Sequence, residues 1–229
     1  MSALEAFARS LWLAEGPTVP FLTIPYPTRM AVVRLASGDL FVWSPIELTP
    51  ALAAELEALG PVRHLVSPNK IHHLFLGPWQ ERWPDARLYA PPGLAKKRRD
   101  LRFDAELGDA SDPAWADDLD PIVFGGSLFM EEVVFFHHAS RTALVCDLVQ
   151  RHDPTGVRGL KGFVMRLDGL VGERGSAPRE WRASFLRRAQ IRAARERLLS
   201  LHPERLVIAH GQCAHEGAAE ILTRAMAWM

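Results

Sequence analysis

The stretch Ser67-Pro68-Asn69-Lys70-Ile71-His72-His73 joins an apolar run, Val62 to Val66, to an amphipathic segment. We expect the apolar run to form a strand and Ile71 to Trp83 to form a helix with a break or kink at Pro78. The junction of a strand with a helix is a usual place for an α/β protein to expose its chemistry. The two adjacent histidines suit a metal ion, a proton relay or simple packing, and the stretch alone does not choose among these.

The sequence before this stretch predicts a β-hairpin and a capped helix. Met30 to Leu35 and Leu40 to Trp43 are strand-like runs on either side of the turn signal Ser37-Gly38-Asp39. Thr49-Pro50 is a helix start, with Thr49 as the N-cap, and Gly60 is a suitable stop. Shorter strands are expected at residues 11–13 and 21–24. This half therefore begins as a sheet with a helix to cover it.

The sequence after this stretch repeats the order of strands followed by helices. Strands are expected at 87–90, 121–124, 133–136, 142–149 and 206–209, and helices at 156–171, 179–201 and 214–228. The same order in both halves predicts sheets packed together and covered by helices on the outside.

Composition excludes several classes of protein. Of the 229 residues, 48% are apolar and 24% are charged, which is the balance of a globular protein with a core. Lysine plus arginine and aspartate plus glutamate both number 27, so no global field favours nucleic acid or an acidic membrane. The two cysteines, Cys146 and Cys213, are far apart, which fits a reducing compartment. With neither a signal-peptide pattern nor a long uncharged apolar run, we expect a soluble cytoplasmic protein.

Residues able to bind a metal follow several of the predicted strands. His72-His73 follow the strand at 62–66, His137-His138 the strand at 133–136, Asp147 the strand at 142–146, and His210 the strand at 206–209. Imidazole and carboxylate are suitable ligands for zinc, iron or manganese. Ligands that gather at the ends of several strands predict a single shared site.

These residues resemble the motifs of the metallo-β-lactamase superfamily, and more narrowly a divergent branch whose members carry an Asn-Lys-x-His-His stretch. The superfamily pattern is Thr-His-x-His-x-Asp-His after a strand, then Gly-His, Gly-Asp at a strand end, and a final Gly-His. It falls on Ser67 to His73, then on His137, on Asp147 in Val145-Cys146-Asp147, and on His210 in Ala209-His210-Gly211. The resemblance covers residue 28 onward and implies an α/β fold, a four-layer αββα sandwich, with residues 1–229 as a single domain.

The departures from the pattern imply a reduced metal site. Pro68 and Lys70 stand where the family has its first two histidines, and His72 stands in place of its aspartate. The resemblance therefore implies one ion, zinc with iron or manganese as alternatives, or no ion if the site is degenerate. The predicted metal ligands are His72, His73, His137, Asp147 and His210, with His73 and His210 favoured because both match without substitution, and His137 a ligand or a proton carrier.

Lys70 and Asp147 are the predicted catalytic residues. The ammonium of Lys70 could neutralise Asp147 in the position of the missing ion. This hypothesis fails if Lys70→Met leaves metal content, stability and activity all unchanged.

Two functions of different classes remain open at this point. The first is a metal-dependent hydrolase of a small-molecule substrate, because the superfamily hydrolyses lactams, lactones, thioesters and phosphodiesters. The second is a catalytically silent member that acts as a binding or scaffold module, since both early histidines are lost. The arginines of 179–197 are read as a solvated helix face, so neither nucleic acid nor a membrane is expected as a partner. The sequence does not indicate an oligomeric state.

Overall fold

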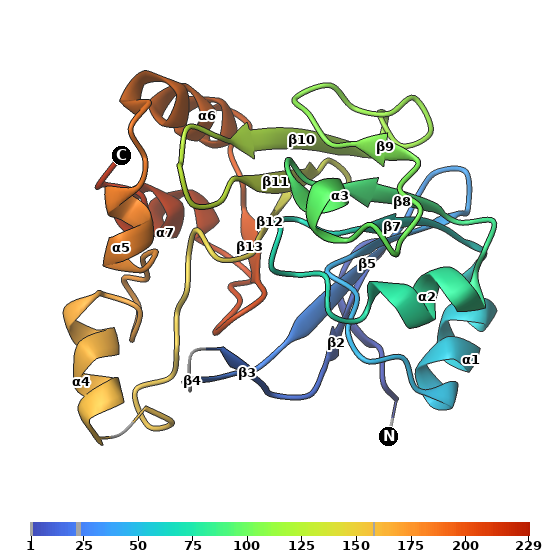
Figure 1. The fold of residues 1–229 in the computed structure, drawn as a ribbon, viewed down its shortest axis with the longest axis horizontal. Helices are drawn as coiled ribbons and strands as arrows, with labels where there is room; N and C mark the ends of the chain where they lie inside the picture. Colours follow the sequence, from blue (N-terminus) through green and yellow to red (C-terminus); the bar gives the residue numbers. More distant parts are fainter. Residues whose placement is uncertain (1, 22–23, 158) are drawn as a thin grey trace.

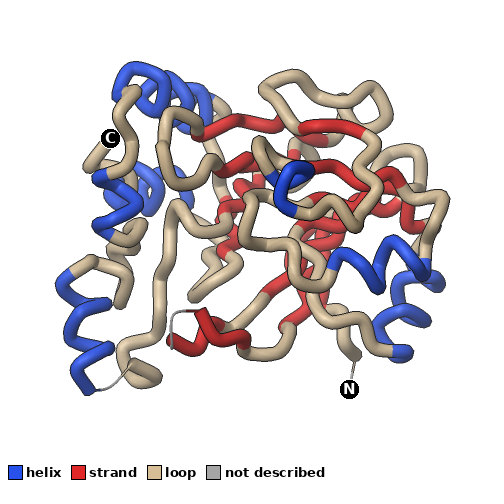
Figure 2. Tube along the Cα trace, in the orientation of Figure 1, coloured by secondary structure: helices blue, strands red, loops and turns tan. Residues whose placement is uncertain are grey.

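Two β-sheets stack face to face and helices cover the outer face of each. The computed structural model describes residues 2–21, 24–157 and 159–229. Figure 1 shows α1 and α2 on one side of the sheets and α5, α6 and α7 on the other, and Figure 2 shows the same layers with the strands in the centre. The predicted four-layer αββα sandwich is confirmed.

The described strands divide between a large sheet, a smaller sheet and a separate hairpin. The first sheet has the order β1 (Glu5–Ala8), β2 (Leu11–Glu15), β5 (Arg29–Arg34), β6 (Leu40–Trp43), β7 (Val62–Val66), β8 (Arg87–Ala90) and β9 (Ala105–Glu106). The second has the order β10 (Leu119–Phe124), β11 (Glu132–His137), β12 (Thr142–Val145) and β13 (Arg205–Ile208). The hairpin joins β3 (Val19–Phe21) to β4 (Ile24–Tyr26). Of the strand predicted at 21–24, Leu22 and Thr23 lie outside the described residues.

Alternation along the strands explains the layers. In β5, Met30 and Val32 pack toward the helices, while Ala31 and Val33 face the other sheet. Successive strand residues point to opposite faces, so a strand covered on both sides must be apolar throughout. Against the first sheet lie α1 (Pro50–Leu59), α2 (Leu76–Arg82) and α3 (Leu94–Lys97), and against the second lie α5 (Arg179–Ala183), α6 (Arg188–Ser200) and α7 (Ala218–Ala225).

The hairpin of β5 with β6 and the capped helix α1 are confirmed. Thr49 accepts a hydrogen bond from the Leu52 N–H at 3.2 Å, and the Gly60 N–H closes the helix on the Leu56 carbonyl. The helix predicted from Ile71 is shorter than expected, because residues before Leu76 form turns. Pro78 lies in the first turn of α2, where its missing N–H has no helical partner to lose.

Three further predicted helices differ from expectation: one is split, one begins later and one is shorter. The helix expected over 179–201 is split, since the Leu186 N–H bonds to the Gly126 carbonyl at 3.0 Å. The helix expected from Ala214 begins only at Ala218, because Ala214 exchanges hydrogen bonds with Leu206. The helix expected over 156–171 is limited to α4 (Gly159–Leu167). Within the described residues, no helix combines the length and apolar character that crossing a bilayer requires.

The direction of the strands sets which residues meet at one edge. β6 and β7 run parallel, as do β12 and β13, so their carboxyl ends lie at common edges. β11 runs antiparallel to β12, so its first residue, Glu132, lies at the edge where β12 ends. The Val133 N–H bonds to the Pro68 carbonyl at 2.8 Å, which connects this edge to the end of β7 in the other sheet.

Candidate metal centre

The chain leaves β7 in a tight turn built by two of its own side chains. Ser67 Oγ donates to the carbonyls of Asn69 and His72, at 2.9 and 2.7 Å. Asn69 Oδ1 accepts from the N–H groups of Ile71 and His72, at 3.0 and 3.3 Å, which is the usual local role of Asn in turns. The turn therefore satisfies its own polar groups and directs adjacent side chains in different directions.

Glu132 fixes the turn that carries Asp147. Its buried carboxylate accepts hydrogen bonds from the N–H groups of Cys146, Asp147 and Leu148, at 2.8, 2.7 and 3.2 Å. These bonds replace ladder bonds of the sheet, and they explain why the strand predicted over 142–149 ends at Val145. Asp147 is thereby held at the strand end with its own carboxylate facing the pocket described below.

In both His72 and His210, the Nδ1 atom of the ring has a hydrogen-bond partner outside the cluster. His210 Nδ1 donates to the Pro27 carbonyl at 2.7 Å, and His72 Nδ1 lies 2.9 Å from Ser44 Oγ. Because a carbonyl only accepts, neutral His210 carries its proton on Nδ1 and presents a lone pair at Nε2. Such support of the second nitrogen is a recurrent feature of metal-binding histidines.

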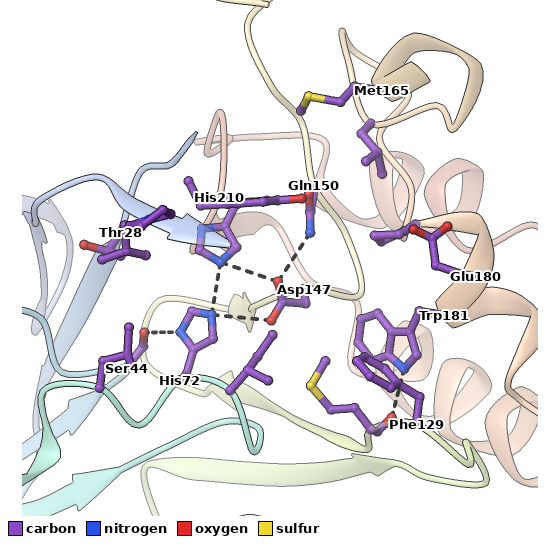
Figure 3. Close-up of a pocket in the computed structure, with 18 of the residues that line it drawn as sticks. Thr28, Ser44, His72, Phe129, Asp147, Gln150, Met165, Glu180, Trp181 and His210 are labelled. Atoms are coloured by element: carbon purple, nitrogen blue, oxygen red, sulfur yellow. Dashed lines mark hydrogen bonds and ion pairs between the residues drawn. The ribbon is translucent and has the colours of Figure 1, made fainter. Parts of the chain in front are cut away.

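The free nitrogens of the two histidines converge with Asp147. His72 Nε2 and His210 Nε2 are 3.0 Å apart, and they lie 3.4 Å from Asp147 Oδ2 and Oδ1 respectively (Figure 3). Donor atoms bound tetrahedrally to zinc at 2.0–2.1 Å are themselves roughly 3.3 Å apart. The donor set and its spacing therefore fit a metal ion.

Cys146 belongs to the same group of potential ligands. Ligand atoms of His72, Cys146, Asp147 and His210 lie within 4.8 Å of one another, and in the described part of the chain this is the group that could hold an ion. Sequence reasoning missed Cys146, whose one signal was its place beside Asp147. Its side chain is fully buried between the two sheets, and burial raises the pKa of its thiol well above the usual value. Cys146 is not among the described residues that line the pocket, whereas His72, Asp147 and His210 are, so we assign the site to these three residues.

The charges at the site follow from burial and from close neighbours. Burial alone raises the pKa of Asp147, but the hydrogen bond and charge of His72 and the charge of His210 outweigh it and hold this pKa below its ordinary value. Burial lowers the pKa of His210 to about 4, although the charge of Asp147 opposes this shift. Burial and the charge of Asp147 raise the pKa of Glu132. Near neutral pH the cluster thus offers an ionised carboxylate and a neutral imidazole, as metal binding requires.

Asn69, and not Lys70, occupies the position predicted to neutralise Asp147. Asn69 Nδ2 donates to Asp147 Oδ2 at 2.8 Å and lies 3.3 Å from Glu132 Oε2. The ammonium of Lys70 lies over the ring of Phe129, 5.4 Å from its centre. The prediction that Lys70 contacts Asp147 is therefore wrong in this structure, because the Asn69 turn directs the next side chain away.

His73 lies outside the cluster, contrary to the sequence prediction. Arg98 Nη1 donates to His73 Nδ1 at 3.0 Å and to the His73 carbonyl at 2.8 Å. Burial, with the charges of Lys97 and Arg98, lowers the pKa of His73 to about 4. The turn sends His72 toward His210 and His73 toward α3, so only one of the two histidines reaches the cluster.

His137 lies at the opposite end of its strand from the cluster. In β11 it pairs with Leu119 and Thr142, whereas Glu132, at the start of the same strand, contacts the Asp147 turn. Five residues of extended chain separate these two ends by roughly 16 Å. His137 Nδ1 bonds to Ser140 Oγ at 2.7 Å. Its predicted role as ligand or proton carrier at this site does not agree with the structure.

The cluster forms part of the wall of a pocket of about 470 Å³. Figure 3 shows His72, His210 and Asp147 together on one side and Trp181 and Glu180 on the other. Most of the lining is apolar, with polar groups at the cluster and with Asp168 and Glu180 as further carboxylates, as in many small-molecule sites. The lining residues are Val19, Pro20, Tyr26, Thr28, Ser44, Pro45, Ile71, His72, Leu74, Phe75, Phe129, Met130, Asp147, Gln150, Val164, Met165, Asp168, Leu170, Pro178, Glu180, Trp181 and His210.

Comparison with solved structures defines the class of fold. The chain is similar to DIM-1 metallo-β-lactamase exposed to ceftazidime, with 14% identity and a TM-score of 0.65 over 99% of this chain and 97% of that chain. It is also similar to the metallo-β-lactamase FIM-1 from Pseudomonas aeruginosa in its mono-zinc form (12%, TM-score 0.64, 99% and 96%) and to one from Hirschia baltica (14%, 0.63, 98% and 96%). The protein therefore has the metallo-β-lactamase fold.

The family assignment is more specific. The chain belongs to the family described as a domain of unknown function, DUF4336, whose model matches residues 11–157. The matched segment contains His72 and Asp147 but ends before His210. Among curated proteins, none matches the sequence.

Proposed function

We propose that the protein is a metal-dependent hydrolase with one metal ion, held by His72, Asp147 and His210. The observation that carries this proposal is the convergence of the two Nε2 atoms and the Asp147 carboxylate at 3.0 to 3.4 Å. Two imidazoles and one carboxylate form the donor set of several catalytic zinc and iron sites, with a position left open for water or substrate. We therefore propose zinc, with iron or manganese as alternatives.

The open side of the cluster faces the pocket, so substrate can reach it. When bound, the ion supplies Lewis acidity, which polarises a carbonyl or phosphoryl oxygen and makes water a nucleophile near neutral pH. Gln150 Nε2 donates to Asp147 Oδ1 at 3.3 Å, while Gln150 Oε1 lies 3.1 Å from His152 Nε2. These contacts orient the carboxylate, and the apolar walls exclude bulk water from the reacting group.

A single ion fits this chain better than two. Pro68 and Lys70, which replace two histidines of the family pattern, offer no imidazole, and the Lys70 ammonium lies over Phe129. Asn69 Nδ2 donates to Asp147 Oδ2 at 2.8 Å, and Asn69 is not among the described lining residues of the pocket. The described residues provide donors for one ion at this edge of the sheets.

The experiment is elemental analysis of protein purified without chelator, and again after dialysis against zinc, iron or manganese. We expect about one equivalent of metal in the wild type. His72→Ala and His210→Ala should each remove most of it. The matched controls are His73→Ala and His137→Ala, which delete histidines outside the cluster and should retain the metal. Cys146→Ala should retain it as well.

A metal content below about a tenth of an equivalent in every preparation would support the silent binding or scaffold module instead. Metal retained in His210→Ala but lost in His73→Ala would contradict the ligand assignment. With loaded protein, hydrolysis of ester, lactone, thioester and phosphodiester substrates should depend on His210, and an active His210→Ala variant would contradict the proposed mechanism.

A further inference from the structure

The charges around the pocket restrict its substrate more sharply than the fold does. We propose that this pocket takes a substrate with an apolar body and a positively charged end, and that it discriminates against anions. The inference rests on the proposed hydrolase function for the identity of the reacting group. Its charge preference is carried by the pocket walls, which are separate from the metal ligands.

The walls between the cluster and the far end bind an apolar body. Trp181 and Met130 are buried, and Trp181 Nε1 donates to the Met130 carbonyl at 2.9 Å, so the indole is fixed with its hydrogen bond satisfied. At the rim, Leu74, Phe129 and Val164 are 57%, 48% and 49% exposed. Burial of apolar side chains by a ligand is favourable in proportion to the area removed from water. A hydrocarbon or aromatic substituent is the group that these surfaces fit.

No lysine or arginine is among the described lining residues, whereas two carboxylates stand there besides the proposed metal ligand Asp147: Asp168 and Glu180. The nearby ammonium of Lys70 lies over the Phe129 ring and does not line the pocket. An anion at the far end of this space would meet Glu180 and the half-buried Asp168, and among the described lining residues no lysine or arginine would attract it. A phosphodiester or a carboxylate-bearing lactam is therefore a poor match.

Asp168 and Glu180 mark the end of the pocket that receives the cation. Glu180 lies across the pocket from His72 in Figure 3 and is solvent-exposed. Asp168 pairs with Arg179 at 3.0 Å, and its side chain is 12% exposed against 57% for Arg179, so the arginine lies on the outer side. Burial and the charge of Glu180 raise the pKa of Asp168, and the charges of Arg179 and Arg182 oppose this shift only in part.

These features define a substrate with three parts in order. A hydrolysable carbonyl lies at His72 and His210, an apolar body lies along Trp181, and an ammonium group lies at Glu180. In ester hydrolysis, water oxygen bonds to the carbonyl carbon and the bond from that carbon to the leaving oxygen breaks. One water proton goes to the leaving alcohol and the other leaves the new carboxylic acid, so water is the only co-reactant. An amine-bearing ester or lactone is the substrate class that we infer.

Binding of non-hydrolysable probes tests the charge preference without catalysis. The probes are phenylbutyl-trimethylammonium, phenylbutyl sulfonate and phenylbutanol, which share one apolar body and carry a positive, a negative or no charge. Neither charged group is a strong metal ligand. Titration calorimetry on metal-loaded and chelated protein gives the affinities. We expect the cation to bind about tenfold more tightly than the anion at low salt, with the alcohol between them.

Glu180→Gln should reduce the preference for cation over anion by several-fold and leave phenylbutanol binding unchanged. The matched control is Glu216→Gln, which makes the same charge change at an exposed residue that does not line the pocket. Sulfonate binding as tight as ammonium binding, or no binding of any probe, would overturn the inference, and so would a preference that Glu180→Gln leaves intact.

The two proposals fail in different ways. If the protein binds no metal but chelated protein still prefers the cationic probe, the proposed hydrolase function fails and the cation-binding pocket stands. If the protein binds one equivalent of metal but shows no preference between the charged probes, the proposed hydrolase function stands and the inferred substrate class fails.

Discussion

Asn69 and Asp147 are 78 positions apart in the chain, yet the Asn69 amide donates a 2.8 Å hydrogen bond to the Asp147 carboxylate. The same amide nitrogen lies 3.3 Å from Glu132 Oε2, so a neutral side chain separates two buried acidic groups. This contact connects the turn after β7 in one sheet to the turn after β12 in the other. It aligns His72 and Asp147 relative to each other.

Asn69→Asp tests this alignment. The variant loses the donor between Glu132 and Asp147 and puts a third carboxyl group beside two buried ones. We expect the free energy of unfolding at neutral pH to fall by about 3 kcal/mol, from the lost hydrogen bonds and the added repulsion. Urea unfolding followed by circular dichroism measures it. Wild-type stability together with wild-type metal content would show that the amide does not hold the two turns.

Gly211→Ala tests the backbone that positions His210. Gly211 has φ of +131°, and an added Cβ would lie 2.4 Å from the Arg151 carbonyl oxygen. Because both the conformation and the space exclude a side chain, we expect a loss of at least about 2 kcal/mol in unfolding free energy, and weaker metal binding. Gly108→Ala is the control, since nothing lies within 4 Å of its added Cβ. Thermal unfolding of both variants measures the loss of stability. Equal losses in Gly211→Ala and Gly108→Ala would refute the steric argument.

Added metal should stabilise the protein, because the ion binds the folded state and not the unfolded chain. At a free metal concentration of 100 times the dissociation constant, binding contributes about 2.7 kcal/mol to the free energy of unfolding. We expect a rise in Tm for the chelated wild type and for His73→Ala, and none for His210→Ala. A similar rise in His210→Ala would place the metal elsewhere on the chain. Thermal scans with and without added zinc make the comparison.

His137 should make the protein less stable as pH falls. Burial lowers its pKa to about 4 from an ordinary value of 6.5. As pH falls below about 6.5, the unfolded chain takes up this proton while the folded protein does not, so unfolding is favoured by up to about 1.4 kcal/mol per pH unit until about pH 4. We expect His137→Leu to be less sensitive to pH over this window. Urea unfolding at pH 7 and pH 5 measures the stability of the wild type and of His137→Leu. An equal loss of stability in the two proteins between these pH values would contradict the prediction.

Lys70→Met should leave metal content unchanged. The Lys70 ammonium lies over the Phe129 ring and makes no contact with Asp147 among the described interactions. Loss of this cation–π contact costs about 0.5–1 kcal/mol at an exposed site. Elemental analysis and thermal unfolding of the variant suffice. Loss of metal would restore the electrostatic role that the sequence suggested for Lys70.

Much of the fold could be predicted from local patterns. The apolar runs of β5 and β6, the cap at Thr49 and the stop at Gly60 are determined by neighbouring residues, so the sequence displays them directly. The predictions that failed involve backbone groups with distant partners. Glu132 ends β12 by binding the N–H groups after it, and Gly126 divides α5 from α6 through its carbonyl. No local pattern reveals these bonds.

The candidate site divides in the same way. Residue type and position after a strand were enough to select Asp147 and His210 as candidate ligands. For the third ligand, the sequence left two candidates, His72 and His73. The chain as written could not say which of the doublet faces inward, because that depends on the turn built by Ser67 and Asn69. Nor could it exclude His137, since a residue at the end of a strand lies near the site only if that strand runs in the right direction.

The stretch Ser67 to His73 thus determined by itself that two potential metal ligands follow a strand at Val62 to Val66, because hydrophobic patterning and residue type are local properties. Only the tertiary structure decided that His72 joins His210 while His73 turns to Arg98. The physical reason is that metal coordination depends on the distances between side chains that are far apart in the sequence. Strand direction, sheet stacking and the hydrogen bonds of buried Asn69 and Glu132 set those distances.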